Sequence, residues 1–341
     1  MRLPVSNLFL VVLILCVTAS YTIVYTGIQS FREGEPSGGN SDTLDYLAMY
    51  RGEKISHVYG APRVAIPLLV RSLPDPPGWI FDSTRRITDT WIATVKFGIV
   101  NFVFLALTGI LFFYFLLQLD FSTWESLLGI LLFYTARPLV QHAGVPMLET
   151  AGYFFLLLCV YAILREHYVM LVLTFLVGVF VKETVFLALP ALLLSEQKHH
   201  KVKLISLLLP GFIAYYTFRF YLYHIDVREL WFDTKLTSQA REALFSAAHF
   251  NKLLDLFSSF GLLWIPALYA LMHAKLPALL RRWSYLIVIM VAVIFLFRLD
   301  LGRILFNTFP VVIPLALYGI RGMLGWKNDL KEQAPDVLRL G

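Results

Sequence analysis

The chain has 341 residues, of which 58% are hydrophobic and only 15% are charged, and its mean hydropathy is +0.69. Soluble domains carry about 25% charged residues, so this composition excludes a water-soluble globule. The net charge of +6 does not indicate nucleic-acid binding, because the basic residues are scattered among short loops and form no tract interleaved with aromatic residues. Cys16 and Cys159 each fall inside an apolar run, which excludes a disulfide framework and a paired-cysteine metal site.

Apolar runs of about 20 residues recur from one end of the chain to the other, and each predicts a transmembrane helix in an all-α membrane protein. The first run, residues 8–28, continues past a small-residue string that resembles a signal-peptide cleavage site, so we expect an uncleaved first span. The later runs cover residues 96–117, 124–134, 148–164, 168–194, 204–223, 253–272, 283–297 and 304–320.

Lys182 and Glu183 interrupt the run at residues 168–194. A single helix through this run would place both charges near the middle of the membrane, at a cost of about 2.5 to 3.5 kcal/mol for each charge. We therefore expect a hairpin of two short helices that turns at this pair; a buried pair that lines a cavity is the alternative. With the hairpin, about ten segments place both termini in the cytoplasm, together with the lysines and arginines of the short loops, as the positive-inside rule requires.

Residues 1–341 are expected to form a single polytopic membrane domain. Its first extracytoplasmic loop, residues 29–95, carries amphipathic interfacial helices, and a second large extracytoplasmic loop covers residues 224–252. The second loop has the pattern of an ordinary surface helix, with a role in acceptor access as the alternative. Residues 321–341 form a cytoplasmic tail.

The first extracytoplasmic loop contains two aspartates in a short helical pattern. Asn40 or Ser41 can cap this helix, so Asp42 falls in its first turn, with Tyr46 one turn further along the same face. Asp42 and Asp45 can serve simply to stabilise the helix N-terminus and its dipole, which is a common use of aspartate. The alternative is proton transfer by one of the two carboxylates.

Two arginines later in the same loop flank an apolar segment. The pattern between Arg63 and Arg71, which includes Pro67, predicts an interfacial helix at residues 64–73. Both arginines can extend to the phosphates of ordinary membrane lipids. The alternative is that one guanidinium binds the phosphate of a specific donor with two parallel N–H groups.

Four short motifs follow one another along the chain: Asp-x3-Tyr after the first span, Arg-x3-Pro-Leu-Leu, a Lys-Glu pair at the end of a short helix, and an arginine that opens a late span containing prolines. Their positions are Asp42 with Tyr46, Arg63 with Pro67, Lys182 with Glu183, and Arg303. This order resembles bacterial members of the GT-C superfamily of membrane glycosyltransferases. The chain departs from better-studied members in replacing adjacent acidic residues by Asp42-x2-Asp45, and in lacking a large soluble C-terminal domain.

The resemblance implies a GT-C-like fold in a bacterial inner membrane. It implies an inverting glycosyltransferase that moves a sugar from a polyprenyl-phosphate donor to a glycan, lipid or protein acceptor at the outer face of the membrane. Asp42 is then the general base, with Asp45 as the second choice. The residues expected to bind the substrate and its phosphate are Tyr46, Arg63, Lys182, Glu183 and Arg303. No cofactor is implied, although a divalent cation at the two aspartates is left open.

Two other classes of function remain open: a transporter or flippase for a lipid-linked intermediate, and a non-catalytic subunit of a polysaccharide-assembly complex. A transporter is expected to carry charges near the membrane midplane and paired interrupted helices in its two halves. The spans of this sequence are nearly free of charge and show no such pair. A metal site at His142 and Glu149 is not expected, because no second histidine stands at ligand spacing.

Overall fold

The structure, a computed structural model, describes residues 5–31, 41–53, 63–77, 88–195, 201–223, 249–297 and 301–325. Every regular element in these ranges is a helix, so the all-α class is confirmed for the described part of the chain. Of the second extracytoplasmic loop expected at residues 224–252, residues 224–248 lie outside the described residues, as does the tail from residue 326 onward; residues 249–252 belong to the helix that begins at His249.

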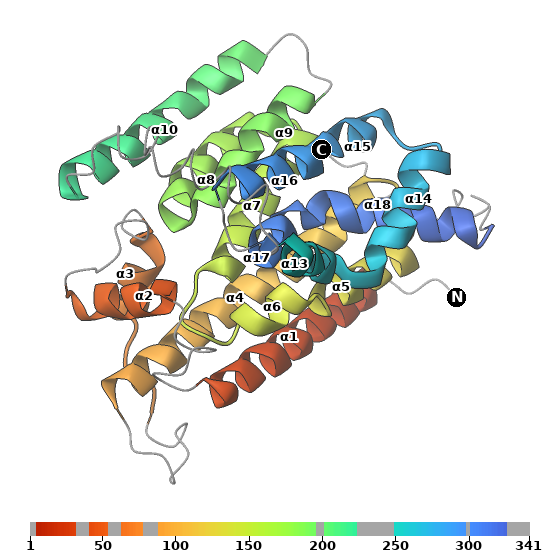
Figure 1. Ribbon diagram of the computed structural model, residues 1–341. Coiled ribbons are helices and arrows are strands. Elements are labelled where there is room, and N and C mark those ends of the chain that lie inside the picture. The colour runs from red at the N-terminus through yellow and green to blue at the C-terminus, as the bar shows by residue number, and fades with distance from the viewer. Residues whose placement is uncertain are drawn as a thin grey trace.

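The helices follow the apolar runs of the sequence closely (Figure 1). In the first half of the chain they are α1 (Val5–Ser30), α2 (Ser41–Arg51), α3 (Ala65–Ser72), α4 (Asp89–Gln118), α5 (Thr123–Tyr134), α6 (Arg137–His142) and α7 (Glu149–Leu164). In the second half they are α8 (Tyr168–Val181), α9 (Ala188–Leu194), α10 (Lys201–Tyr223), α13 (His249–Phe260), α14 (Trp264–His273), α15 (Ala278–Trp283), α16 (Tyr285–Phe297), α17 (Leu301–Leu305) and α18 (Phe309–Met323). Short 3-10 helices join some of them: η3 (Glu183–Leu187), η4 (Gly261–Leu263) and η5 (Phe306–Thr308).

Four segments of the described chain are long and apolar enough to cross a membrane: Asn7–Ser30, Asp89–Gln118, Leu256–His273 and Gly302–Met323. Shorter apolar helices accompany them at Thr123–Tyr134, Glu149–Leu164, Tyr168–Val181, Glu183–Leu194 and Leu204–Phe218. By length and composition these helices fit an integral membrane protein. The expected total of about ten spans stays a prediction, because each shorter helix falls below the roughly 20 residues of a full span.

α1 and α4 lie side by side in opposite directions, and small residues let them approach closely. Ile28 near the end of α1 lies against Gly98 near the start of α4, whereas Cys16 in the middle of α1 lies against Gly109 further along α4. Contacts at small residues are the usual way in which helices pack in a membrane, where no hydrophobic effect drives helix association.

The chain reverses direction at Lys182, the residue between α8 and η3. Lys182 has an extended backbone, with φ −162° and ψ 135°. After the turn, Val185 packs back against Gly178. Phe186 lies beside Phe175 of α8, with ring centroids 5.8 Å apart. The hairpin expected at this position is therefore present, and it leaves the charges at a helix end instead of a helix middle.

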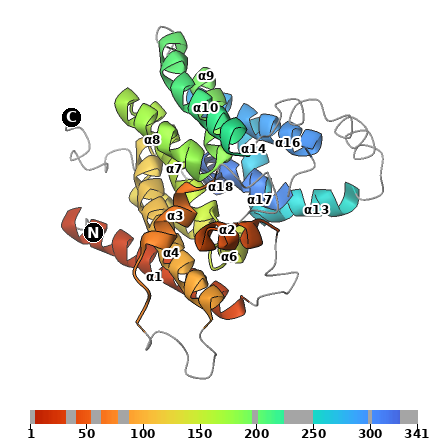
Figure 2. The ribbon, with the colours of Figure 1, turned by 90° about the vertical axis from the view of Figure 1, so that its left-hand side faces the viewer.

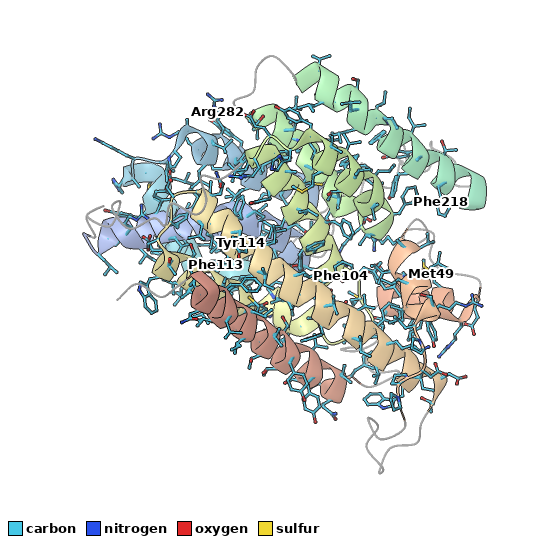
Figure 3. The ribbon with its side chains drawn as sticks, turned by 180° about the vertical axis from the view of Figure 1, so that it is seen from behind. Met49, Phe104, Phe113, Tyr114, Phe218 and Arg282 are labelled. Atoms are coloured by element: carbon cyan, nitrogen blue, oxygen red, sulfur yellow. The ribbon has the colours of Figure 1, made fainter. Side chains whose placement is uncertain are left out.

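The bundle has two chemically distinct ends. In Figure 1, α2, α3 and the start of α4 lie at the left, whereas α1 begins at the right. Figure 2 faces the left-hand end and shows α2 and α17 close together, in agreement with a side-chain hydrogen bond between them. In the view from behind, Met49 of α2 marks this end and Arg282 of α15 lies toward the opposite one (Figure 3).

A polar clamp at the opposite end joins α5 to α18. Arg321 donates from Nε and Nη2 to the two carboxylate oxygens of Glu125, each at 2.8 Å. Glu125 also completes a capping box with Ser122 at the start of α5. The guanidinium lies over the rings of Phe121 and Tyr318. Every polar group of this clamp is engaged in holding helices together, so we assign it a structural role.

Two segments depart from the sequence-based expectation. The run at residues 253–272 is divided at Gly261, whose φ of +53° favours glycine, so α13 and α14 are separate helices. α4 begins at Asp89, earlier than its apolar run, because the hydroxyl of Thr88 accepts a hydrogen bond from the backbone N–H of Trp91 and caps the helix.

The close packing between α1 and the loop that follows α6 can be tested by a substitution at Gly27. A Cβ atom at this position would overlap the backbone of Gly144. We expect Gly27→Val to destabilise the protein by about 3 kcal/mol or more, because the backbone it meets cannot move aside as a side chain would. Thermal unfolding in detergent measures this effect. Thr26→Val, which places the same side chain on the exposed face of α1, is the control and is expected to leave the melting temperature unchanged.

Candidate functional site

A second, smaller hydrophobic core fixes α2 and α3 on the bundle. It consists of Tyr46, Ile66, Val70, Phe97, Val100, Met147, Leu148, Ala151 and Val181. These residues come from α2, α3, α4, α7, α8 and the loop before α7. Because one apolar core holds all these elements at one end of the bundle, the polar residues at their termini meet in the same place.

Arg63, just before α3, is the first of three cations that meet the carboxylates of the site. It donates from Nε to Oε2 of Glu183 at 2.7 Å, and Nη2 is hydrogen-bonded to Oε1 of the same carboxylate. Its Nη1 donates to the hydroxyl of Tyr46 at 2.6 Å and lies 3.9 Å from Oδ2 of Asp42. The guanidinium therefore links α2 to the turn between α8 and η3.

Arg303 of α17 approaches the same aspartate from the other side. Its Nη1 donates to Oδ2 of Asp42 at 2.9 Å and lies 3.2 Å from Oε1 of Glu149. Asp42 Oδ2 is thus shared by two guanidiniums that come from segments far apart in the sequence. The Asp42 side chain remains 22% exposed and the Glu183 side chain 36%, so these two carboxylates are the open part of the arrangement.

Lys182 and Glu149 form the buried part of the site. The Lys182 ammonium donates to Oε1 of Glu149 at 2.7 Å, and the Glu149 side chain is only 3% exposed. Oε2 of Glu149 has no hydrogen-bond partner among the described residues. Buried charges are tolerated when they are paired in this way, and the pair fixes the start of α7 against the end of α8.

We call these six ionisable residues the charged cluster: Asp42, Arg63, Glu149, Lys182, Glu183 and Arg303. Three are carboxylates and three are cations, so the cluster has no net charge when all are ionised. Among the described residues, no group of three or more His, Cys, Asp or Glu side chains could hold a metal ion.

The environment shifts the proton affinities of three groups at the site. Burial alone would lower the pKa of Arg63, but the carboxylate of Glu183 and the neighbouring Tyr46 and Asp42 hold it well above its ordinary value. Burial lowers the pKa of Lys182; Glu149 opposes this shift, and the two arginines of the cluster add to it. Burial raises the pKa of the Tyr46 phenol, so its hydroxyl stays neutral. The site thus holds a permanent guanidinium charge and a more readily deprotonated ammonium.

The structure brings together most of the candidate residues that the sequence singled out. The side chains of Asp42, Tyr46, Arg63, Lys182, Glu183 and Arg303 all lie in or against the charged cluster. Asp45 is only 2% exposed, so it is less open to a substrate than Asp42. His142 ends α6, close enough to Glu149 to act on it electrostatically.

Glu149 is the member of the cluster to which the sequence analysis gave no role. It follows a loop and opens an apolar helix, a position where an acidic residue ordinarily stabilises the helix dipole. Only the chain reversal at Lys182 and the position of Arg303 make it a shared partner of two cations. The sequence offers one signal for it, an isolated carboxylate at the edge of a span.

A small crevice lies between α7, η3, α16 and the start of α18. It is lined by Leu156, Val160, Leu187, Leu286, Asn307, Thr308, Pro310 and Val311. Asn307 follows Arg303 by one helical turn, so the crevice begins near the charged cluster. Apart from the two polar residues of η5, its walls are apolar.

Comparison of this protein with protein-family models, with curated proteins and with solved structures gives no match. The geometry of the charged cluster is therefore the basis for the functional argument.

The pair between Glu149 and Lys182 can be tested by a double-mutant cycle on thermal stability. We expect Glu149→Gln to cost about 3 to 5 kcal/mol, because it leaves Lys182 buried without its carboxylate. The double variant Glu149→Gln/Lys182→Met should be more stable than the sum of the single effects, by about 1 to 3 kcal/mol. Strict additivity would show that the two side chains do not interact.

Lys275 provides a matched control for the lysine substitution. It is exposed and lies after α14, at the opposite end of the bundle. Lys275→Met removes the same charge and adds the same side chain, and is expected to change stability by no more than about 0.5 kcal/mol.

Proposed function

We propose that this protein is an inverting membrane glycosyltransferase that moves a sugar from a polyprenyl-phosphate donor to a hydroxyl acceptor. The observation that carries the proposal is the convergence of Asp42, Arg63, Lys182 and Arg303, from four separate parts of the chain, at one end of an apolar bundle. Such a site offers a carboxylate and several fixed cations at the place where a lipid head group would meet water.

Asp42 has the properties required of the general base. It is the carboxylate of the α2 helix that is open to solvent, whereas Asp45 of the same helix is buried. In the proposed reaction the acceptor hydroxyl attacks the anomeric carbon of the sugar and Asp42 accepts its proton. The bond between that carbon and the phosphate oxygen breaks, and the lipid phosphate leaves with the electron pair. Direct displacement of this kind inverts the anomeric configuration.

Arg63 and Arg303 are the groups that would hold the phosphate. Their Nη1 atoms both approach Oδ2 of Asp42, at 3.9 and 2.9 Å, so an anionic oxygen already occupies the space between them. A phosphate oxygen has the same charge and the same hydrogen-bonding capacity as that carboxylate oxygen. In a partly dehydrated site, fixed cations stabilise the developing charge of the leaving phosphate more strongly than water does.

The alternative functions are a transporter or flippase for a lipid-linked intermediate and a non-catalytic subunit of an assembly complex. Glu149 opens α7 and Lys182 follows α8, so the charges lie at helix ends and not halfway along the spans. A pathway across the membrane is expected to carry charges near the midplane. The position of the cluster therefore favours chemistry at one face, and the transfer assay below separates all three functions.

Asp42→Asn tests the base directly. With purified protein in lipid vesicles and a labelled polyprenyl-phosphate sugar, we expect sugar transfer to fall by about 100-fold or more, because the amide cannot take the acceptor's proton. Donor binding should persist, since the arginines remain. Asp89→Asn is the matched control: Asp89 is an exposed aspartate in the first turn of α4 at the same end of the bundle.

The same assay distinguishes the alternatives. Undiminished transfer by Asp42→Asn would contradict the base assignment. No transfer to any glycan, lipid or protein acceptor by the wild type, together with movement of the donor across the vesicle bilayer, would instead support a flippase. Neither transfer nor movement would support a non-catalytic subunit.

The proposed outer location of the site can be tested by labelling with a membrane-impermeant maleimide. Cys16 and Cys159 are fully buried and should not react with the maleimide. Glu53→Cys, after α2, is expected to react in intact cells, whereas Lys275→Cys, after α14, should react only after permeabilisation. The reverse pattern would place the charged cluster on the cytoplasmic side.

A further inference from the structure

The turn between α8 and η3 sends two adjacent side chains to different partners. Lys182 has an extended backbone, and successive side chains of an extended backbone point to opposite faces. Lys182 therefore reaches Glu149 of α7, whereas Glu183 reaches Arg63. Gly152 of α7 leaves room for this arrangement, because a Cβ atom there would lie 2.9 Å from Cδ of Lys182. The buried pair of Lys182 and Glu149 thus anchors the turn from which Glu183 extends.

Glu183 holds one edge of the Arg63 guanidinium. Its two carboxylate oxygens accept hydrogen bonds from Nε, at 2.7 Å, and from Nη2. Two parallel hydrogen bonds fix the plane of a guanidinium, which a single contact does not. Nη1 donates to the hydroxyl of Tyr46 at 2.6 Å, and Tyr46 is only 1% exposed. The orientation of Arg63 is therefore set by an anchored turn and a buried ring.

These contacts leave part of the guanidinium available to a ligand. A guanidinium carries five N–H groups, and the hydrogen bonds to Glu183 and Tyr46 use three of them. Within the described part of the chain, one N–H group of Nη1 and one of Nη2 are left. Nη1 lies 3.9 Å from Oδ2 of Asp42, the oxygen that Arg303 also contacts. The remaining N–H groups thus belong to the side of the guanidinium that the proposed function assigns to the phosphate.

We propose that Glu183 is a positioning residue, which fixes the Arg63 guanidinium so that its remaining N–H groups meet the donor phosphate. The inference rests on the proposed function and gives Glu183 a role without contact to the phosphate. A carboxylate repels a phosphate and has no hydrogen to donate to it, so Glu183 acts through Arg63. An arginine that is held in place before the donor arrives loses less side-chain freedom on binding.

Positioning and simple charge predict opposite effects on phosphate binding. If Glu183 were only a nearby negative charge, neutralising it would tighten the binding of an anion. If it positions Arg63, the same substitution weakens binding. Glu183→Asp separates the two effects further, because it keeps the charge but is one methylene too short to hold both Nε and Nη2 from the anchored turn.

The experiment measures the binding of farnesyl methyl phosphate, a phosphodiester without a sugar, to the purified full-length protein by calorimetry. We expect Glu183→Gln and Glu183→Asp each to weaken binding by about 10- to 100-fold, because the guanidinium is no longer held in the productive orientation. Melting temperatures establish that the variants are folded, and Glu183→Asp provides the comparison if Glu183→Gln does not fold. A purely structural role of Glu183 would leave the affinity of the folded protein unchanged.

Glu53→Gln is the matched control. Glu53 is an exposed glutamate after α2, at the same end of the bundle, and the substitution makes the same change of charge and side chain. We expect its affinity to stay within about twofold of the wild type, because salt screens exposed charges. An equal loss in this control would overturn the specific role of Glu183.

A second cycle tests whether Glu183 acts through Arg63. Arg63→Lys keeps the positive charge but cannot form the pair of parallel hydrogen bonds, and is expected to weaken binding by itself. In this background Glu183→Gln should change the affinity by no more than about twofold. Losses that multiply would show that Glu183 acts by another route and would overturn the inference.

Two further outcomes separate this inference from the proposed function. Unchanged or tighter binding by either Glu183 variant would overturn the positioning role and leave the phosphate site in place. No binding of the diester by the wild type would overturn the phosphate site of the proposed function together with the role of Glu183.

Discussion

The burial of Glu149 is the constraint on which the arrangement of this end of the protein depends. Its carboxylate is 3% exposed and must therefore be paired, and the partners are Lys182 and Arg303. Lys182 reaches it because the chain reverses between α8 and η3, and Arg303 reaches it because α17 ends near the start of α7. Asp42 and Arg63 extend the same network to α2 and α3. The charged cluster thus forms because the starts of α2 and α7, the residue before α3, the turn after α8, and α17 all lie together.

The rest of the bundle supplies what such a cluster needs. Glycines let α1, α4 and the loop after α6 approach closely, and a separate core fixes α2 and α3 over the cluster. The opposite end is held by the pair of Glu125 and Arg321, in which every group serves helix packing. The two polar ends therefore differ: at one end every polar group is engaged in helix packing, and at the other a partly exposed aspartate lies between two arginines. For this reason we assign the proposed function to the end that carries Asp42.

Much of this fold could be predicted from the sequence because hydrophobic runs and helix ends are local signals. The hairpin at Lys182 followed from the cost of placing two charges inside a membrane. Asp42, Arg63 and Arg303 were singled out by a resemblance in motif order. That order does not predict how far apart their side chains lie in the fold. The role of Glu149 could not be predicted, because its partners are fixed by tertiary packing. The break at Gly261 was also missed, since one glycine in an apolar run is compatible with a continuous helix.

The most direct measurement of the central claim is an experimental structure of the protein in a lipid nanodisc with farnesyl methyl phosphate bound. The account predicts the phosphate between the guanidiniums of Arg63 and Arg303, at hydrogen-bond distances of about 2.7 to 2.9 Å. A phosphate bound elsewhere, or a structure in which Asp42 and both arginines point into open solvent without contacting one another, would contradict it.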